Sequence, residues 1–134
     1  MPLPSLRADG LLPPGTHRAT LHEVLTAYPA RTQQRQILND SMQRVAEEVQ
    51  HLDPTIVIYV DGSYVTRKAE PNDVDLLLVT PTFTEEYIKR YLTQVCPVEL
   101  VSLDITVESQ LPSVIFDLFT ESRRGQAKGI IQLQ

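Results

Sequence analysis

Asp73 and Asp75 are the residues of this chain best suited to chemistry, because they stand two apart at the start of the apolar run 74–79. Residues two apart on a β-strand share one face, so these carboxylates would lie side by side. Like charges at this spacing repel unless a cation lies between them, and Mg²⁺ is commonly held by one or two carboxylates together with substrate phosphates. The pair predicts a magnesium site. The alternative is that both aspartates end a strand in solvent.

Gly62 and Ser63 follow a second apolar run, Ile56 to Val60, which is β-branched and too short for a helix. Glycine allows a ligand to approach the backbone closely, and serine is a good N-cap for a helix. A short helical turn over residues 64–67 would then offer free N–H groups to a phosphate. The alternative is an ordinary loop after a strand.

A third carboxylate, Asp104, lies in an alternating stretch that predicts a strand over residues 98–107. Val101, Leu103, Ile105 and Val107 would face one side of it. Asp104 would face the other side, with the polar neighbours Ser102 and Thr106.

A strand ending in Gly62-Ser63, nine intervening residues and an Asp-x-Asp motif opening an apolar strand resemble the signature of the polymerase-β-like nucleotidyltransferase superfamily. That superfamily expects a further carboxylate on a later strand, and Asp104 matches it. The chain departs from the pattern at Asp61, where an apolar residue is usual. The segments 12–17 and 124–130 resemble the flanks of a small bacterial group within the superfamily, so the resemblance extends over most of the chain.

The resemblance implies Mg²⁺-dependent transfer of a nucleoside monophosphate from an NTP, with ATP as the first candidate, to an acceptor hydroxyl. Asp73, Asp75 and Asp104 would hold two Mg²⁺ ions roughly 3.5–4 Å apart, and Mn²⁺ could substitute. Gly62, Ser63 and Lys68 would bind the phosphates. Further charge could come from basic residues that are otherwise solvated surface: Arg67, Arg123, Arg124 and Lys128.

The acceptor stays open between a partner protein, as in toxin–antitoxin pairs, and an RNA end or small metabolite. The net charge of −5 disfavours a grip on extended duplex DNA, because such proteins are usually basic. Two other functions are possible. One is a catalytically silent binding module acting as antitoxin or regulator. The other is an α+β domain whose aspartates merely end strands.

Length and composition favour one cytoplasmic domain. With 134 residues, the chain predicts a Pro-rich arm over residues 1–15, lying across the domain or disordered, and a single domain over 16–134. The only cysteine, Cys96, excludes an internal disulfide framework. No apolar run approaches membrane-spanning length, and no signal-peptide core is present at the start, so no membrane partner is expected.

Helices are predicted from caps and periodicity. Thr20 and Glu23 form a capping box for a helix ending near Tyr28. A longer helix over 32–52 carries an apolar stripe, with Gln, Arg and Glu on its opposite face: Leu38, Met42, Val45, Val49 and Leu52. A second capping box, Thr82 with Glu85, would open a helix to Val95.

The remaining segments complete the expected fold. Residues 113–119 suit a short helix or covering loop, residues 130–133 suit an edge strand, and His17 and His22 are expected at the surface. The predicted class is α+β: a small mixed β-sheet with helices packed mainly on one face and the three aspartates on the other.

Overall fold

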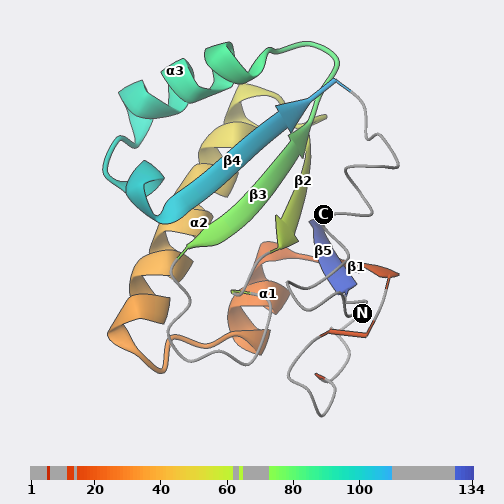
Figure 1. Ribbon diagram of the computed structural model, residues 1–134, viewed down its shortest axis with the longest axis vertical. Helices are drawn as coiled ribbons and strands as arrows, with labels where there is room; N and C mark the ends of the chain where they lie inside the picture. Colours follow the sequence, from red (N-terminus) through yellow and green to blue (C-terminus); the bar gives the residue numbers. More distant parts are fainter. Residues whose placement is uncertain (1–5, 7–11, 14, 62–63, 65–72, 110–128) are drawn as a thin grey trace.

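A mixed β-sheet forms the centre of the computed structural model, which describes residues 6, 12–13, 15–61, 64, 73–109 and 129–134 (Figure 1). In chain order the elements are β1 (Gly15–Ala19), α1 (Leu21–Ala27), α2 (Gln33–Leu52), β2 (Val57–Asp61), β3 (Val74–Val79), α3 (Glu85–Val95), the 3₁₀ turn η2 (Glu99–Ser102), β4 (Leu103–Glu108) and β5 (Gly129–Leu133). The α+β class is confirmed. Residues 113–119 lie outside the described part of the chain.

The five described strands have the order β1-β5-β2-β3-β4. The outer pairs, β1 with β5 and β3 with β4, are parallel, and the central strand β2 runs antiparallel to both of its neighbours, β5 and β3. Residues 130–133 do form a strand, as predicted, but it is not an edge strand, because β5 lies between β1 and β2. The edge strand on that side of the sheet is β1, a polar segment that the sequence did not predict as a strand.

The N-terminal segment packs closely on β5 at Gly129. The Gly129 amide donates to the Leu12 carbonyl at 3.1 Å, and Leu12 is buried. A Cβ at Gly129 would lie 2.2 Å from the Pro13 carbonyl oxygen, so only glycine fits here. His17, expected at the surface, is half-buried with its Nε2 2.7 Å from that oxygen, whereas His22 is exposed.

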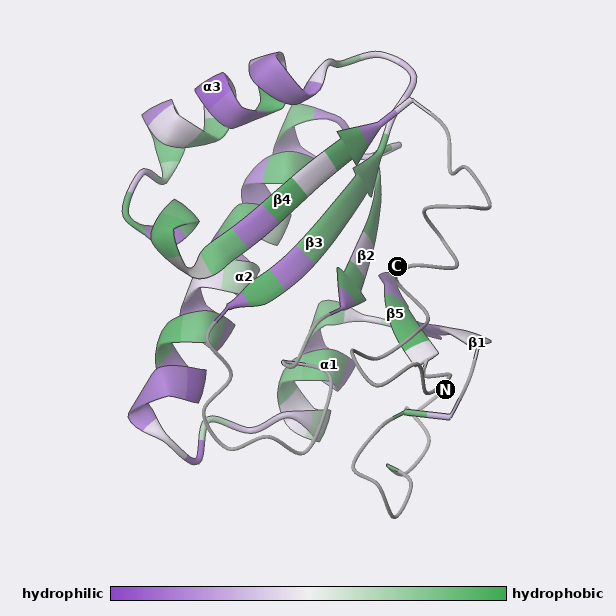
Figure 2. Ribbon diagram, viewed as in Figure 1, coloured by the Kyte–Doolittle hydropathy of each residue, from purple (hydrophilic) through white to green (hydrophobic). Residues whose placement is uncertain are grey.

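Helices α2 and α3 cover one face of the sheet (Figure 1). The predicted stripe of α2 is confirmed, since Leu38, Met42, Val45 and Val49 are fully buried. They share one core with the alternate strand residues that face them: Ile58, Val60, Val74, Leu76, Leu78, Ile105, Ile131 and Leu133. Figure 2 shows the alternation of apolar and polar residues along β4 and the single polar band in the otherwise apolar β3. None of the helices in the described part of the chain is long and apolar enough to cross a membrane.

The arginines of α2 were assigned to its solvent face, and for Arg35 that was wrong. Arg35 is only 6% exposed. It stands three residues before Leu38, on the extension of the buried stripe, so the helical period itself places it inward.

The first capping box is confirmed and the second is wrong by two residues. Thr20 and Glu23 exchange side chain–backbone hydrogen bonds of 3.0 and 3.1 Å. Helix α3 instead begins after Thr84, whose hydroxyl accepts from the Tyr87 amide at 3.2 Å. The Thr82 backbone N–H, which a capping box would pair with the Glu85 side chain, instead donates to the Thr80 hydroxyl at 3.2 Å.

The stretch predicted as one strand over 98–107 divides into η2 and β4. Val101 lies in η2 and is 87% exposed, so its predicted place on the buried face was wrong. Leu103, Ile105 and Val107 do pack against the core. The strand begins at Leu103, which is paired with Val74, the first residue of its partner strand β3.

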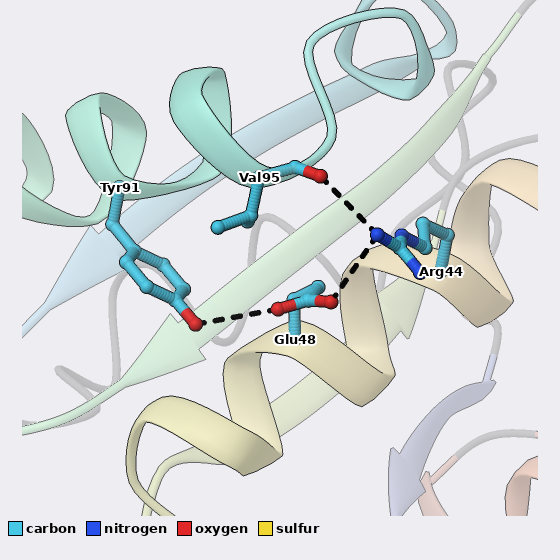
Figure 3. A network of polar contacts seen from close by, with 4 residues as sticks. All are labelled: Arg44, Glu48, Tyr91 and Val95. Atoms are coloured by element: carbon cyan, nitrogen blue, oxygen red, sulfur yellow. Dashed lines mark hydrogen bonds and ion pairs between the residues drawn. The ribbon is translucent and has the colours of Figure 1, made fainter.

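Helix α3 is joined to α2 by the Arg44 network of Arg44, Glu48, Tyr91 and Val95 (Figure 3). The Arg44 guanidinium donates to the Val95 carbonyl at 3.3 Å and pairs with Glu48 at 3.5 Å. The Tyr91 hydroxyl donates to the other oxygen of Glu48 at 3.3 Å. These contacts link the exposed sides of α2 and α3, whereas α3 packs on the core through Ile88 and Leu92.

Candidate active site

Three aspartates occupy one row across neighbouring strands. Asp61 of β2 stands opposite Asp75 of β3, and Asp75 stands opposite Asp104 of β4. Residues at paired positions share a face of the sheet, and their strands are about 4.8 Å apart. We call Asp61, Asp75 and Asp104 the aspartate row.

The aspartate row lies on the face opposite α2 and α3. The residues next to it along the strands, Val60, Leu76 and Ile105, belong to the core under the helices, so the aspartates project from the other side. Within the described part of the chain no helix covers β3 and β4 on that side (Figure 1). Burial falls along the row: Asp61 is 4% exposed, Asp75 is half-buried and Asp104 is exposed.

The predicted site residues are thus partly brought together. Asp75 and Asp104 are direct neighbours on adjacent strands. Asp73 is half-buried, directly precedes β3 and stands two residues before Asp75. Gly62, Ser63 and Lys68, predicted for phosphate binding, lie outside the described residues, as do Arg67, Arg123, Arg124 and Lys128.

Carboxylates in this arrangement suit a hard divalent cation. Like charges directly opposite each other in a sheet are destabilising, and a bound cation removes that cost. Oxygen donors from one or two carboxylates are what Mg²⁺ takes, with substrate phosphates completing its shell. In the described ranges, however, no three His, Cys, Asp or Glu side chains are gathered closely enough to hold a metal ion. The magnesium site therefore stays a prediction based on donor chemistry and register.

Asp61 is the residue that sequence reasoning set aside. It was treated as a departure from a familiar pattern, and it is instead the last residue of β2 and one end of the aspartate row. The available signal was its position at the end of a buried strand, next to the loop that leads to Asp73. Its pairing with Asp75 depends on strand register and could not be inferred from spacing.

Beneath this end of β2 lies a buried polar cluster, the Arg35 network of Tyr28, Arg35, Asn39 and Tyr64. The Arg35 Nη1 donates to the Tyr64 carbonyl at 3.0 Å, and the Tyr64 hydroxyl donates to Asn39 Oδ1 at 2.5 Å. Asn39 Nδ2 donates to the Tyr28 carbonyl at 3.0 Å. The guanidinium carbon lies 5.1 Å from the Tyr64 ring centroid and 5.5 Å from that of Tyr28.

Burial controls the ionisation of this cluster. It raises the pKa of the Tyr28 and Tyr64 phenols far above the ordinary value, although the nearby Arg35 charge lowers both in part. Burial also lowers the pKa of Arg35. Both phenols therefore remain protonated at neutral pH, and the Tyr64 hydroxyl serves as a donor to Asn39.

A family model matches residues 4–134 of this chain, and its description is a family of unknown function, DUF6932. The chain belongs to this family. No curated protein and no solved structure matches the chain.

Proposed function

We propose that the protein is a Mg²⁺-dependent nucleotidyltransferase that moves a nucleoside monophosphate from an NTP, with ATP as the first candidate, to an acceptor hydroxyl. The observation that supports this most is the pairing of Asp75 with Asp104 on the face of β3 and β4 that lies opposite α2 and α3. An Asp-x-Asp pair with a carboxylate on the next strand is the donor set that the sequence motif implies.

In this proposal Asp73 and Asp75 hold the cation that accompanies the triphosphate, and Asp104 contributes to a second one. Bound Mg²⁺, or Mn²⁺, supplies charge neutralisation on the phosphates and a lower pKa for the acceptor hydroxyl. Asp104, the most exposed of the three, accepts the proton of that hydroxyl. The acceptor oxygen bonds to the α-phosphorus, the bond from that phosphorus to the bridging oxygen breaks, and pyrophosphate leaves with the electron pair.

A partner protein is the first acceptor class and an RNA end the second. A net charge of −5 gives little attraction for a long polyanion. An acceptor hydroxyl presented by another folded protein would bring its own binding surface.

The test is label transfer from each of the four α-³²P-labelled NTPs with Mg²⁺ or Mn²⁺, with and without host lysate. Asp75→Asn should reduce transfer to background, because the amide removes a carboxylate oxygen that the cation would need. Asp40→Asn is the matched control, the same chemical change at an exposed position on α2. Full activity in Asp75→Asn would refute the proposal.

A silent nucleotide-binding module is the second candidate, and Asp61 favours it as a carboxylate in a position where the motif has an apolar residue. Such a module would be stabilised by nucleotide only with Mg²⁺ present, by about 2.7 kcal/mol at a hundred times the dissociation constant. It would transfer no label with any NTP. If neither metal nor nucleotide stabilises the protein, both candidates fail, and the remaining alternative is an α+β domain whose aspartates merely end strands.

A further inference from the structure

Two valines of the turn η2 extend from the folded chain into solvent. Val98 is 78% exposed and Val101 is 87% exposed. They are three residues apart in a 3₁₀ turn, in which side chains at this spacing lie one above the other. The apolar surface of the pair is therefore continuous, and apolar side chains gathered at one exposed place mark a contact surface more often than single ones do.

Helix α2 adds a third apolar side chain to this surface. The flank of α2 that carries Ser41 and Arg44 faces the end of α3, because Arg44 donates to the Val95 carbonyl just before the turn. Ser41 is buried on this flank, and η2 packs against α2. Ile37, one helical turn earlier on the same flank, is 45% exposed. We call these three exposed side chains the η2 patch: Ile37, Val98 and Val101.

The η2 patch lies at the end of the sheet that carries the aspartate row. The turn leads directly into β4, whose second residue is Asp104 (Figure 1). Because Asp104 follows Val101 by three residues, their Cα atoms are at most about 11 Å apart. Asp104 is itself exposed. A molecule that covers the valines therefore comes within reach of the carboxylate to which the proposed function assigns the acceptor proton.

The charges beside the η2 patch are acidic. Glu99 stands between the two valines in η2, and Asp104 follows them. Arg44, the basic residue on this flank of α2, is already engaged in the Arg44 network. A second copy of this chain would bring the same carboxylates against these, and an RNA would bring phosphates, so both would be repelled. The complementary occupant is a protein surface with an apolar centre and lysine or arginine at its rim.

We propose that the η2 patch is the docking surface for the acceptor protein of the transfer, and that docking there brings the acceptor hydroxyl to Asp104. This inference rests on the proposed function and names the partner that the function needs, a folded protein with an apolar, basic-rimmed contact surface. The bonds that form and break are those of the proposed transfer. The η2 patch contributes binding and orientation of the acceptor.

The first test removes the apolar contact. Val98→Ser combined with Val101→Ser should lower label transfer to protein in limiting host lysate about tenfold or more, because the acceptor binds less well. Thermal stabilisation by MgATP should be unchanged, since the nucleotide site is untouched. Tyr87→Ser is the matched control. It removes another exposed apolar side chain, about 12 Å along α3 from Val95, and should leave transfer unchanged.

The second test reverses the charge beside the valines. Glu99→Lys should lower transfer about threefold in 50 mM NaCl, and this deficit should shrink in 0.5 M NaCl, because salt screens the rim of the interface. Glu86→Lys makes the same change at an exposed position of α3 outside the η2 patch and should have no effect. A threefold loss in both variants would show that net charge, and not this surface, governs acceptor binding.

Photo-crosslinking identifies the occupant and needs no nucleotide. Benzoylphenylalanine placed at Val98 should crosslink to the lysate protein that receives label, identified by mass spectrometry, and Glu99→Lys should weaken that crosslink. The same probe placed at Tyr87 should not reach this protein. Two copies of this chain crosslinked to each other, or label received by RNA alone, would overturn the docking role.

Transfer within about twofold of wild type in Val98→Ser/Val101→Ser would overturn the docking role as well, and so would an equal loss in Tyr87→Ser. If wild-type protein transfers no label, the proposed function fails. The crosslink then decides on the surface alone. A single protein captured from Val98 but not from Tyr87, and less well in Glu99→Lys, would support a protein-docking surface, whereas no crosslink would refute it.

Discussion

Helix α2 makes the same kind of contact twice in different surroundings. Arg35 donates to the Tyr64 carbonyl at 3.0 Å, and Arg44 donates to the Val95 carbonyl at 3.3 Å. Arg35 is 6% exposed and lies among aromatic rings. The Arg44 side chain is 49% exposed and forms an ion pair with Glu48.

The difference shows how burial sets the consequence of losing a contact. In the Arg44 network, water replaces any bond that is removed, so each contact contributes little. In the Arg35 network water has no access, so a deleted partner leaves a buried polar atom without its bond. Among the described residues every buried side-chain nitrogen or oxygen has a hydrogen-bond partner. The four predictions that follow test this contrast.

The largest stability effect is expected for Arg35→Met. The Tyr64 carbonyl loses its donor inside the core, and the contacts of the guanidinium with two rings are lost, which should cost about 2–4 kcal/mol. Urea unfolding at pH 7 measures this loss. A loss no greater than that of Arg44→Met would show that burial is not what separates the two arginines.

Asn39→Leu should cost about 2 kcal/mol, because the Tyr64 hydroxyl loses its acceptor and the Tyr28 carbonyl loses the amide donor. Adding Tyr64→Phe should recover about 1 kcal/mol, since the hydroxyl left without its acceptor is then absent. The four unfolding free energies form a double-mutant cycle. Strict additivity would mean that the 2.5 Å contact contributes nothing of its own.

Alkaline pH should destabilise the protein through the buried phenols. Burial raises the folded-state pKa of Tyr28 and Tyr64 above the unfolded value of about 10, so their contribution is complete below about pH 10 and is lost as pH rises further. The free energy of unfolding should fall by about 1.4 kcal/mol per pH unit for each phenol. Tyr64→Phe should roughly halve that slope between pH 10 and 11. An unchanged slope would contradict the burial of this group.

The smallest effects belong to the exposed junction between α2 and α3. Arg44→Met, Glu48→Gln and Tyr91→Phe should each change stability by less than about 1 kcal/mol. The ion-pair part should vanish in 1 M salt, where charges are screened over about 3 Å. A loss in Arg44→Met that persists in 1 M salt would reveal packing by its alkyl chain.

Local signals predicted the helices and the central strands well. The Thr20–Glu23 capping box and the stripe of α2 both occur as expected, because caps and periodicity act within a few residues. Strand β3 begins and ends where its apolar run does. The errors came where a local pattern met a non-local constraint: Val101 continued an alternation that β3 does not extend far enough to pair.

The candidate site was predictable only in part for the same reason. Asp73 and Asp75 could be paired from their spacing, and Asp104 from a resemblance. The place of Asp61 in the aspartate row follows from antiparallel register, in which a shift of one residue would turn its side chain to the other face. The position of Arg35, three residues before Leu38, predicted a buried side chain, whereas its charge predicted an exposed one. Only the aromatic rings and the Tyr64 carbonyl that surround it in the folded chain explain its burial.

The sequence by itself determined the α+β class and, to within a few residues, the extents of the helices, because these depend on neighbours along the chain. Tertiary structure alone decided that β5 lies inside the sheet, that three aspartates align across β2, β3 and β4, and that one arginine of α2 is buried while another is exposed. Each of these depends on which distant segments pack together. The packing of distant segments depends on how the apolar surface of the whole chain is buried, and no single stretch of residues determines it.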